Sequence, residues 1–122
     1  MKILVIDDSE SIRFLMEEIL KKKHQVITAN HGKEGIEIFE KNHDFDLVIT
    51  DRNMPGGMLG EEVIRRVKLS NPKIKAVLMS SQDEEEIARI AMAAGADTTL
   101  NKSFLFDVES IIQNLFPALL SG

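Results

Sequence analysis

The sequence contains no cysteine, tryptophan or tyrosine. Without cysteine there can be no disulfide bond, thiolate metal ligand or cysteine nucleophile, so any chemistry must use oxygen and nitrogen groups. Phe is the only aromatic residue, so a surface that stacks nucleic-acid bases is not expected. No apolar run is long enough to cross a bilayer, and the N-terminal segment MKILVIDD lacks the features of a signal peptide. We therefore expect a cytoplasmic protein with no membrane insertion.

Positive charge is also scarce, because 15 Lys and Arg stand against 20 Asp and Glu, for a formal net charge of −5. Direct binding to the phosphate backbone of nucleic acid needs a concentrated basic face, so it is not expected here. The length of 122 residues suits a single core, and no linker or low-complexity tract interrupts it. We expect residues 1–122 to form one domain.

Apolar segments of strand length alternate with segments of helical periodicity, which is typical of repeated βα units. The predicted strands are 2–6, 25–29, 47–50, 76–79 and 98–100. The first helix should turn one apolar face to the sheet, formed by Ile12, Leu15, Met16, Ile19 and Leu20. Pro55, Gly56 and Gly57 indicate a loop over 52–59 before a helix over 60–69, and Gly95 should cap a helix over 83–94. The pattern predicts an α/β fold, with an open parallel sheet and helices on both faces.

Polar residues follow four of these strands. Asp7 and Asp8 follow the first, Asp51 the third, Ser80 the fourth and Lys102 the fifth. Ligands of open parallel sheets bind at the carboxyl ends of the strands, so three carboxylates should meet in one crevice. Such close like charges need a screening cation, and with no His or Cys nearby a hard ion such as Mg²⁺ fits best. With the ammonium of Lys102 and the hydroxyl of Ser80, the group could neutralise a transferred phosphoryl group.

These residues resemble the receiver-domain pattern of bacterial two-component response regulators, over essentially the whole chain and in particular that of single-domain chemotaxis-type regulators. The matching motifs are Asp7-Asp8, Asp51-Arg52-Asn53-Met54-Pro55, Ser80-Ser81, Gly95-Ala96-Asp97 and Lys102. The resemblance implies a flavodoxin-like, doubly wound sheet with strand order 2-1-3-4-5 and five helices. It also implies that Asp51 is the phosphoacceptor, that Lys102 contacts the phosphoryl group and that Ser80 moves to hydrogen-bond it.

The metal site that the resemblance implies has four members. Asp8 and Asp51 would bind Mg²⁺ directly, Asp7 mostly through water, and the backbone carbonyl of Asn53 would be a further ligand. The phosphoryl donor would be a sensor histidine kinase or a phosphotransfer protein, and the output a changed surface that binds a downstream protein. Beyond its own phosphorylation and dephosphorylation, the chain would not be an enzyme. We expect a monomer, with dimerisation on phosphorylation as an alternative.

The chain departs from the family pattern at three places. The loop between Pro55 and Gly60 has one residue more than usual, so the entry to the third helix should be altered locally. Ser103 replaces a proline whose peptide bond to the lysine is usually cis in the family. A cis bond before serine costs about 2.5 to 4 kcal/mol, so we expect a trans Lys102–Ser103 bond. We also expect the lysine to be directed at Asp51 nevertheless. Thr99 replaces the aromatic residue whose rotamer commonly reports the active state, so coupling should run mainly through Ser80.

Other functions and simpler interpretations also fit parts of the sequence. A pseudo-receiver, a constitutive interaction module, would keep the fold without the chemistry. A phosphatase would usually place an acid/base Asp where Asn53 stands, and a flavin protein would need aromatic or Gly-rich phosphate loops that are absent.

Taken singly, the site residues could be ordinary, with Asp8 or Ser9 as a helix cap. The histidines should be solvated and far from the site; they are His24, His31 and His43. The run 84–86 should be an acidic first helical turn. Met54, Met58 and Met79 should pack internally, or in the case of the first two line a partner surface.

Overall fold

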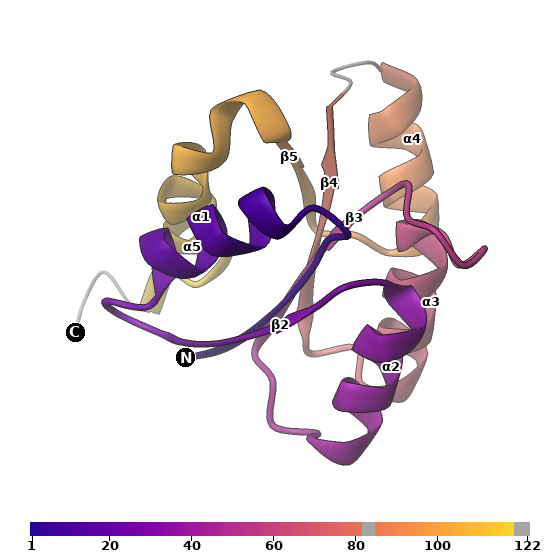
Figure 1. Cartoon of the computed structure of the whole chain (residues 1–122), viewed down its shortest axis with the longest axis horizontal. Helices are drawn as coiled ribbons and strands as arrows, with labels where there is room; N and C mark the ends of the chain where they lie inside the picture. The colour runs from indigo at the N-terminus through magenta and orange to yellow at the C-terminus, as the bar shows by residue number, and fades with distance from the viewer. Residues whose placement is uncertain (82–84, 119–122) are drawn as a thin grey trace.

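A five-stranded parallel sheet forms the centre of the molecule in the computed structural model, which describes residues 1–81 and 85–118 (Figure 1). Its strands are β1 (Lys2–Ile6), β2 (Gln25–Ala29), β3 (Leu47–Asp51), β4 (Lys75–Ser80) and β5 (Thr98–Asn101). They are hydrogen-bonded in the order β2-β1-β3-β4-β5, and every pair is parallel. Both the predicted fold class and the predicted strand order are therefore confirmed.

Helices cover both faces of the sheet (Figure 1). They are α1 (Glu10–Leu20), α2 (Gly32–Lys41), α3 (Gly60–Ser70), α4 (Glu85–Ala94) and α5 (Val108–Leu115), with a 3₁₀ helix η1 (Lys102–Asp107) before α5. Successive strand residues point to opposite faces. In β1, Ile3 and Val5 pack with the buried residues of α1 and α5, whereas Leu4 and Ile6 pack with those of α2 and α3. The chain thus places β1 and β3 side by side at the centre, with their carboxyl ends forming the switch-point crevice.

The buried stripe of α1 is narrower than predicted. Met16 and Leu20 are fully buried, but 43% of Leu15 is exposed, so its predicted contact with the sheet is wrong. Neighbouring helix residues are about 100° apart around the axis, which carries Leu15 to the edge of the stripe centred on Met16. Its neighbour Phe14 is 62% exposed, so α1 presents apolar side chains to solvent as well as to the core.

Several predicted helix ends are confirmed by local geometry. The side chain of Ser9 accepts a hydrogen bond from the Ile12 amide and caps α1. Gly95 follows α4 with φ +99°, the left-handed conformation expected of a C-terminal glycine cap. The predicted start of α4 at Asp83, and Glu84 of its acidic first turn, lie outside the described residues, while Glu85 and Glu86 do occupy its first turn. None of the described helices is long and apolar enough to span a membrane.

The segment after β5 was predicted only in part. The Lys102–Ser103 peptide bond is trans, as expected from the serine. The 3₁₀ helix η1 was not predicted, because its sequence KSFLFD has no helical periodicity. Its start is fixed by Asn101, whose side-chain oxygen accepts from the Ser103 amide at 2.8 Å.

The histidines have more specific surroundings than the sequence suggested. His31 is half-buried after the carboxyl end of β2, and its Nδ1 accepts from the Glu34 amide to cap α2, a role that the sequence did not predict. His24 is half-buried, and burial together with the nearby N-terminal ammonium lowers its pKa. His43 is exposed and contacts the ring of Phe39 edge-on.

Candidate functional site

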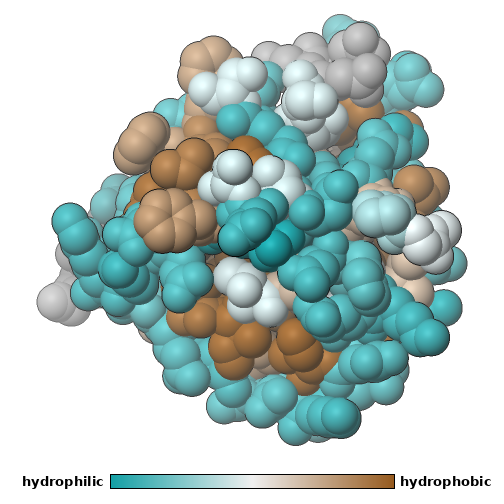
Figure 2. Space-filling model, in the orientation of Figure 1, coloured by the Kyte–Doolittle hydropathy of each residue, from teal (hydrophilic) through white to brown (hydrophobic). Residues whose placement is uncertain are grey.

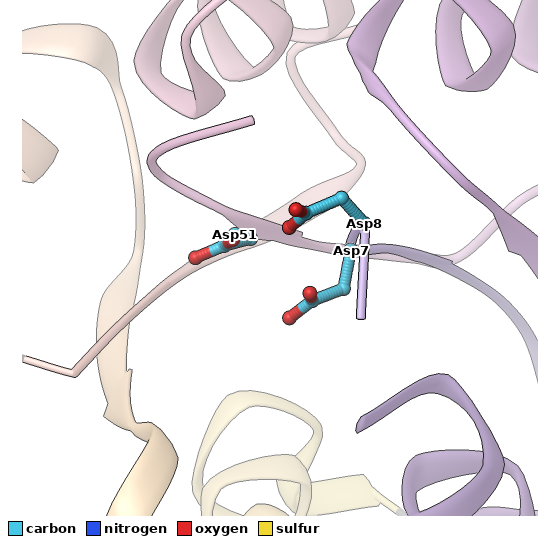
Figure 3. A group of neighbouring side chains, drawn as sticks. All are labelled: Asp7, Asp8 and Asp51. Carbon is cyan, nitrogen blue, oxygen red and sulfur yellow. The ribbon is translucent and has the colours of Figure 1, made fainter. Parts of the chain in front are cut away.

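Three carboxylates meet at the carboxyl ends of β1 and β3. Ile6 pairs with Thr50 across these strands, so the residues that follow, Asp7 and Asp51, come to lie next to each other. Each carboxylate of Asp7, Asp8 and Asp51 offers an oxygen within 4.8 Å of the others (Figure 3). Asp7 and Asp51 are buried and Asp8 is exposed, so the cluster opens to solvent on the side of Asp8.

Asp7 is the most deeply buried member of the cluster, with no exposed surface. Its Oδ1 accepts from the Ser9 amide at 2.8 Å, and its backbone carbonyl accepts from Arg13 Nη1 at 2.8 Å. Its Oδ2 lies 2.8 Å from Lys102 Nζ as an ion pair. The buried Asp7 carboxylate is therefore compensated chiefly by the Lys102 ammonium.

Asp51 lies at the end of β3 with its carboxylate between two donors. Its Oδ1 accepts from the Arg52 amide at 2.9 Å and lies 3.3 Å from Lys102 Nζ. Burial and the negative charge of Asp7 raise the pKa of Asp51, and Lys102 and the Arg52 amide oppose that rise without cancelling it. The carboxylate is thus less well solvated than an ordinary surface aspartate.

Lys102 reaches the cluster from the end of β5, across the ends of β3 and β4. Burial lowers the pKa of its ammonium, but the Asp7 and Asp51 carboxylates outweigh this effect and leave the pKa raised. The ammonium therefore stays charged around neutral pH, and it points at Asp51 as predicted despite the serine that follows it.

Two predicted site residues lie at the border of this group. Ser80 is buried at the end of β4, one residue beyond Met79, which pairs with Asp51 in the sheet. Asn53 is exposed at the start of the loop that follows β3. The structure thus gathers Asp7, Asp8, Asp51 and Lys102, with Ser80 on the next strand, while a role for the Asn53 carbonyl remains a prediction.

Gly60, at the start of α3, lies directly against the backbone of Asp51, whereas the sequence placed it only at a helix boundary. A Cβ at this position would lie 2.1 Å from the Asp51 carbonyl oxygen and 2.9 Å from Arg52 Cα. The Gly60 amide also donates to the Arg52 carbonyl at 2.8 Å. Glycine is required because α3 begins in direct contact with the backbone of Asp51, which no periodicity in the sequence reveals.

The donor set fits a hard divalent cation. Carboxylate oxygens are ligands that suit Mg²⁺, and Asp7, Asp8 and Asp51 each offer one close to the others. The three carboxylates also carry more negative charge than the single ammonium of Lys102 can neutralise.

Comparison with known proteins agrees with this geometry. The profile of the response regulator receiver domain family matches residues 3–115. The chain belongs to the response regulator receiver domain family. As a receiver domain it is 33% identical over 107 residues to the sporulation initiation phosphotransferase F of Bacillus subtilis, covering 87% of this chain and 85% of the relative.

Solved receiver structures superpose closely on the chain. The chemotaxis protein CheY4 of Vibrio cholerae, crystallised at low pH, matches with a TM-score of 0.86 at 29% identity, over 93% of this chain and 97% of the other. The response regulator TrrA of Thermotoga maritima, in complex with Mg²⁺ and BeF, matches with a TM-score of 0.82 at 31% identity, again over 93% and 97%.

Some relatives are longer proteins. The cell cycle response regulator CtrA of Brucella ovis is 33% identical over 105 residues, which cover 85% of this receiver domain but only 44% of CtrA. Its likeness concerns the receiver part alone.

Proposed function

We propose that this receiver domain is a phosphorylation-dependent signalling switch, in which Asp51 accepts a phosphoryl group from a sensor histidine kinase or a phosphotransfer protein in a Mg²⁺-dependent reaction. The observation that carries the proposal is the buried Asp51 carboxylate, 3.3 Å from the Lys102 ammonium and clustered with two further carboxylates. The TrrA structure supports the metal, because a receiver 31% identical to this one is held there with Mg²⁺ and BeF.

The chemistry assigns a role to each residue of the site. An Asp51 carboxylate oxygen attacks phosphorus, the bond from phosphorus to the donor's histidine nitrogen breaks, and an acyl phosphate forms on Asp51. Lys102 neutralises charge on the phosphoryl oxygens, and the Ser80 hydroxyl donates to one of them. Mg²⁺, held by Asp7, Asp8, Asp51 and the Asn53 carbonyl, would supply further charge neutralisation. The chain would catalyse only its own phosphorylation and dephosphorylation, in the cytoplasm.

An exposed apolar surface beside the site supports docking of the phosphoryl donor. It comprises Phe14 and Leu15 of α1 and Phe104 and Phe106 of η1, each between 43% and 78% exposed. A hollow of about 420 Å³ lies between the two helices, lined in part by Leu15, Ile19 and Phe106. Figure 2 shows apolar side chains gathered on this part of the molecule. Because α1 follows Asp8 and η1 begins at Lys102, a donor that covers both helices would contact two elements that are continuous with the site.

A pseudo-receiver, a constitutive interaction module, is the competing function. A pseudo-receiver does not require a lysine directed at Asp51, nor three carboxylates that repel one another at close range unless a cation is bound. The deciding experiment is incubation with acetyl phosphate and Mg²⁺, followed by intact mass spectrometry. We expect one added phosphoryl group on the parent and none on Asp51→Asn, and an unchanged parent mass under conditions that label another receiver would establish the pseudo-receiver.

A further inference from the structure

A buried ion pair lies next to the site and takes no part in the function proposed above. Arg52 directly follows Asp51, and its Nη2 lies 3.4 Å from Glu61 Oε2 in the first turn of α3. Glu61 is 9% exposed, and the pair is largely withdrawn from water. Burying a carboxylate costs free energy unless a partner of opposite charge hydrogen-bonds it well. The geometry of this contact therefore decides how well the Glu61 carboxylate is compensated.

The contact is incomplete in a specific way. An arginine can bind a carboxylate with two parallel N–H bonds, at about 2.7 to 2.9 Å each. Here the single contact is longer than that range, and among the described residues two buried atoms lack any hydrogen-bond partner, Arg52 Nε and Glu61 Oε1. They are the two atoms that a side-on pair through Nε and Nη2 would join. A small closing movement would therefore satisfy both at once.

The pair also closes the base of the loop that follows β3. Figure 1 shows this loop between β3 and α3. The Arg52 carbonyl accepts from the Gly60 amide at 2.8 Å, and the Arg52 side chain meets Glu61, so one residue holds both ends of the segment 53–59. That segment contains two glycines with positive φ, Gly56 at +92° and Gly57 at +86°. The two glycines give the tip of the loop little stiffness of its own, whereas Met54 packs in the core. Asn53 is therefore held between Arg52 and Met54.

We propose that Arg52 and Glu61 form a positioning clamp for the metal site, which closes to a two-bond pair as Mg²⁺ binds. The inference rests on the proposed function, since it assigns the Asn53 carbonyl to Mg²⁺. Pulling that carbonyl toward the ion moves the backbone of Arg52, and the same movement closes the pair. Because binding coupling is reciprocal, a clamp that closes with the metal must strengthen metal binding.

Substitutions at Arg52 separate the clamp from simple charge. Arg52→Lys keeps the positive charge but cannot form two parallel bonds, and Arg52→Gln removes the charge. If Arg52 acted only as a nearby cation, Arg52→Gln would bind Mg²⁺ more tightly and Arg52→Lys as tightly as the parent. The clamp instead predicts that both variants bind Mg²⁺ at least about fivefold more weakly than the parent. Arg66→Gln is the matched control, because Arg66 pairs with Glu62 on the exposed side of the same helix, at 4.0 Å.

The measurement is calorimetric titration with Mg²⁺ alone, together with metal-free unfolding. We expect Arg52→Lys to lose Mg²⁺ affinity while its metal-free unfolding midpoint stays near that of the parent; a fall in stability with unchanged affinity would make the pair merely structural and overturn the clamp. In the parent, Mg²⁺ should slow exchange of the Arg52 Nε–H with water in nitrogen-resolved NMR spectra, and no change there would also overturn it. A parent that binds no Mg²⁺ would instead refute the proposed function itself, and the clamp with it.

Discussion

The ammonium of Lys102 lies nearer to Asp7 than to the proposed phosphoacceptor, at 2.8 Å from Asp7 Oδ2 against 3.3 Å from Asp51 Oδ1. Asp7 has no exposed surface, so it depends most on a compensating charge. Lys102 therefore forms ion pairs with two carboxylates. The three carboxylates of the cluster and this one ammonium together carry a formal charge of −2. A divalent cation would balance that charge.

Replacing Asp51 by asparagine should abolish phosphorylation without unfolding the domain. The substitution nearly preserves the shape of the side chain and removes a charge that burial and Asp7 disfavour. We expect no added phosphoryl group by intact mass, and a metal-free free energy of unfolding at least as large as that of the parent. A large loss of stability would show that Asp51 is structural.

Mg²⁺ should stabilise the folded protein through Asp8 and its neighbours. An ion that binds only the native state at 100 times its dissociation constant adds about 2.7 kcal/mol to the free energy of unfolding. Asp8→Ala should remove most of that gain, because exposed Asp8 is proposed to bind the ion directly. Asp107→Ala is a suitable control, since Asp107 is exposed and its side chain makes no capping bond. Equal Mg²⁺ responses in parent and Asp8→Ala would place the site elsewhere.

The raised pKa of Asp51 gives the metal-free protein a particular pH dependence. The folded state binds the proton more tightly than the unfolded state, whose carboxyl titrates near 3.8. Stability from this group is therefore greatest at low pH and falls as pH rises through the folded pKa. Other groups, including His24, also contribute, so the quantity to measure is the difference in unfolding free energy between parent and Asp51→Asn. As pH rises above 3.8, the unfolding free energy of Asp51→Asn should increase relative to that of the parent. A difference that does not change with pH would contradict the raised pKa of Asp51.

The contact between Gly60 and Asp51 can be tested against a second glycine. At Gly60 a Cβ would meet backbone, the Asp51 carbonyl oxygen at 2.1 Å, whereas at Gly35 it would meet the Ile6 side-chain end, Cδ1, at 2.2 Å. Overpacking costs about 1 to 3 kcal/mol in general, and a backbone obstacle cannot move aside as a side chain can. We expect Gly60→Ala to lower stability and also slow acetyl phosphate labelling, and Gly35→Ala to affect stability only. Equal labelling rates in the two variants would show that the contact between α3 and Asp51 does not affect phosphorylation.

Much of this organisation could be predicted because it depends on patterns along the chain. The alternation of strand and helix segments fixed the sheet, and parallel pairing then brought Asp7, Asp51 and Lys102 together from the ends of separate strands. The strand order itself came from the family resemblance. The width of the buried stripe on α1 was harder to predict, because Leu15 satisfies the helical periodicity and yet lies at the edge of the contact between α1 and the sheet.

Contacts between distant side chains could not be predicted. Arg52 looks like an ordinary loop residue after a strand, and Glu61 like an acidic residue in a first helical turn. Only the fold shows that both are largely buried and face each other. His31 likewise resembles a loop histidine until the entry to α2 makes its ring a cap.

The surface that changes on phosphorylation should be formed by α4, β5 and α5. Thr99, half-buried and paired with Leu78 in the sheet, occupies the place of the usual aromatic switch and has no ring to reorient. The signal must then pass mainly through Ser80, buried at the end of β4, and the segment after it. On binding Mg²⁺ and beryllium fluoride as a phosphoryl mimic, NMR shift changes beyond the metal ligands should concentrate from Ser80 to Lys102. Ser80→Ala should reduce them strongly and Thr99→Ala only slightly, whereas changes confined to α1 and α2 would place the output on the opposite edge of the sheet.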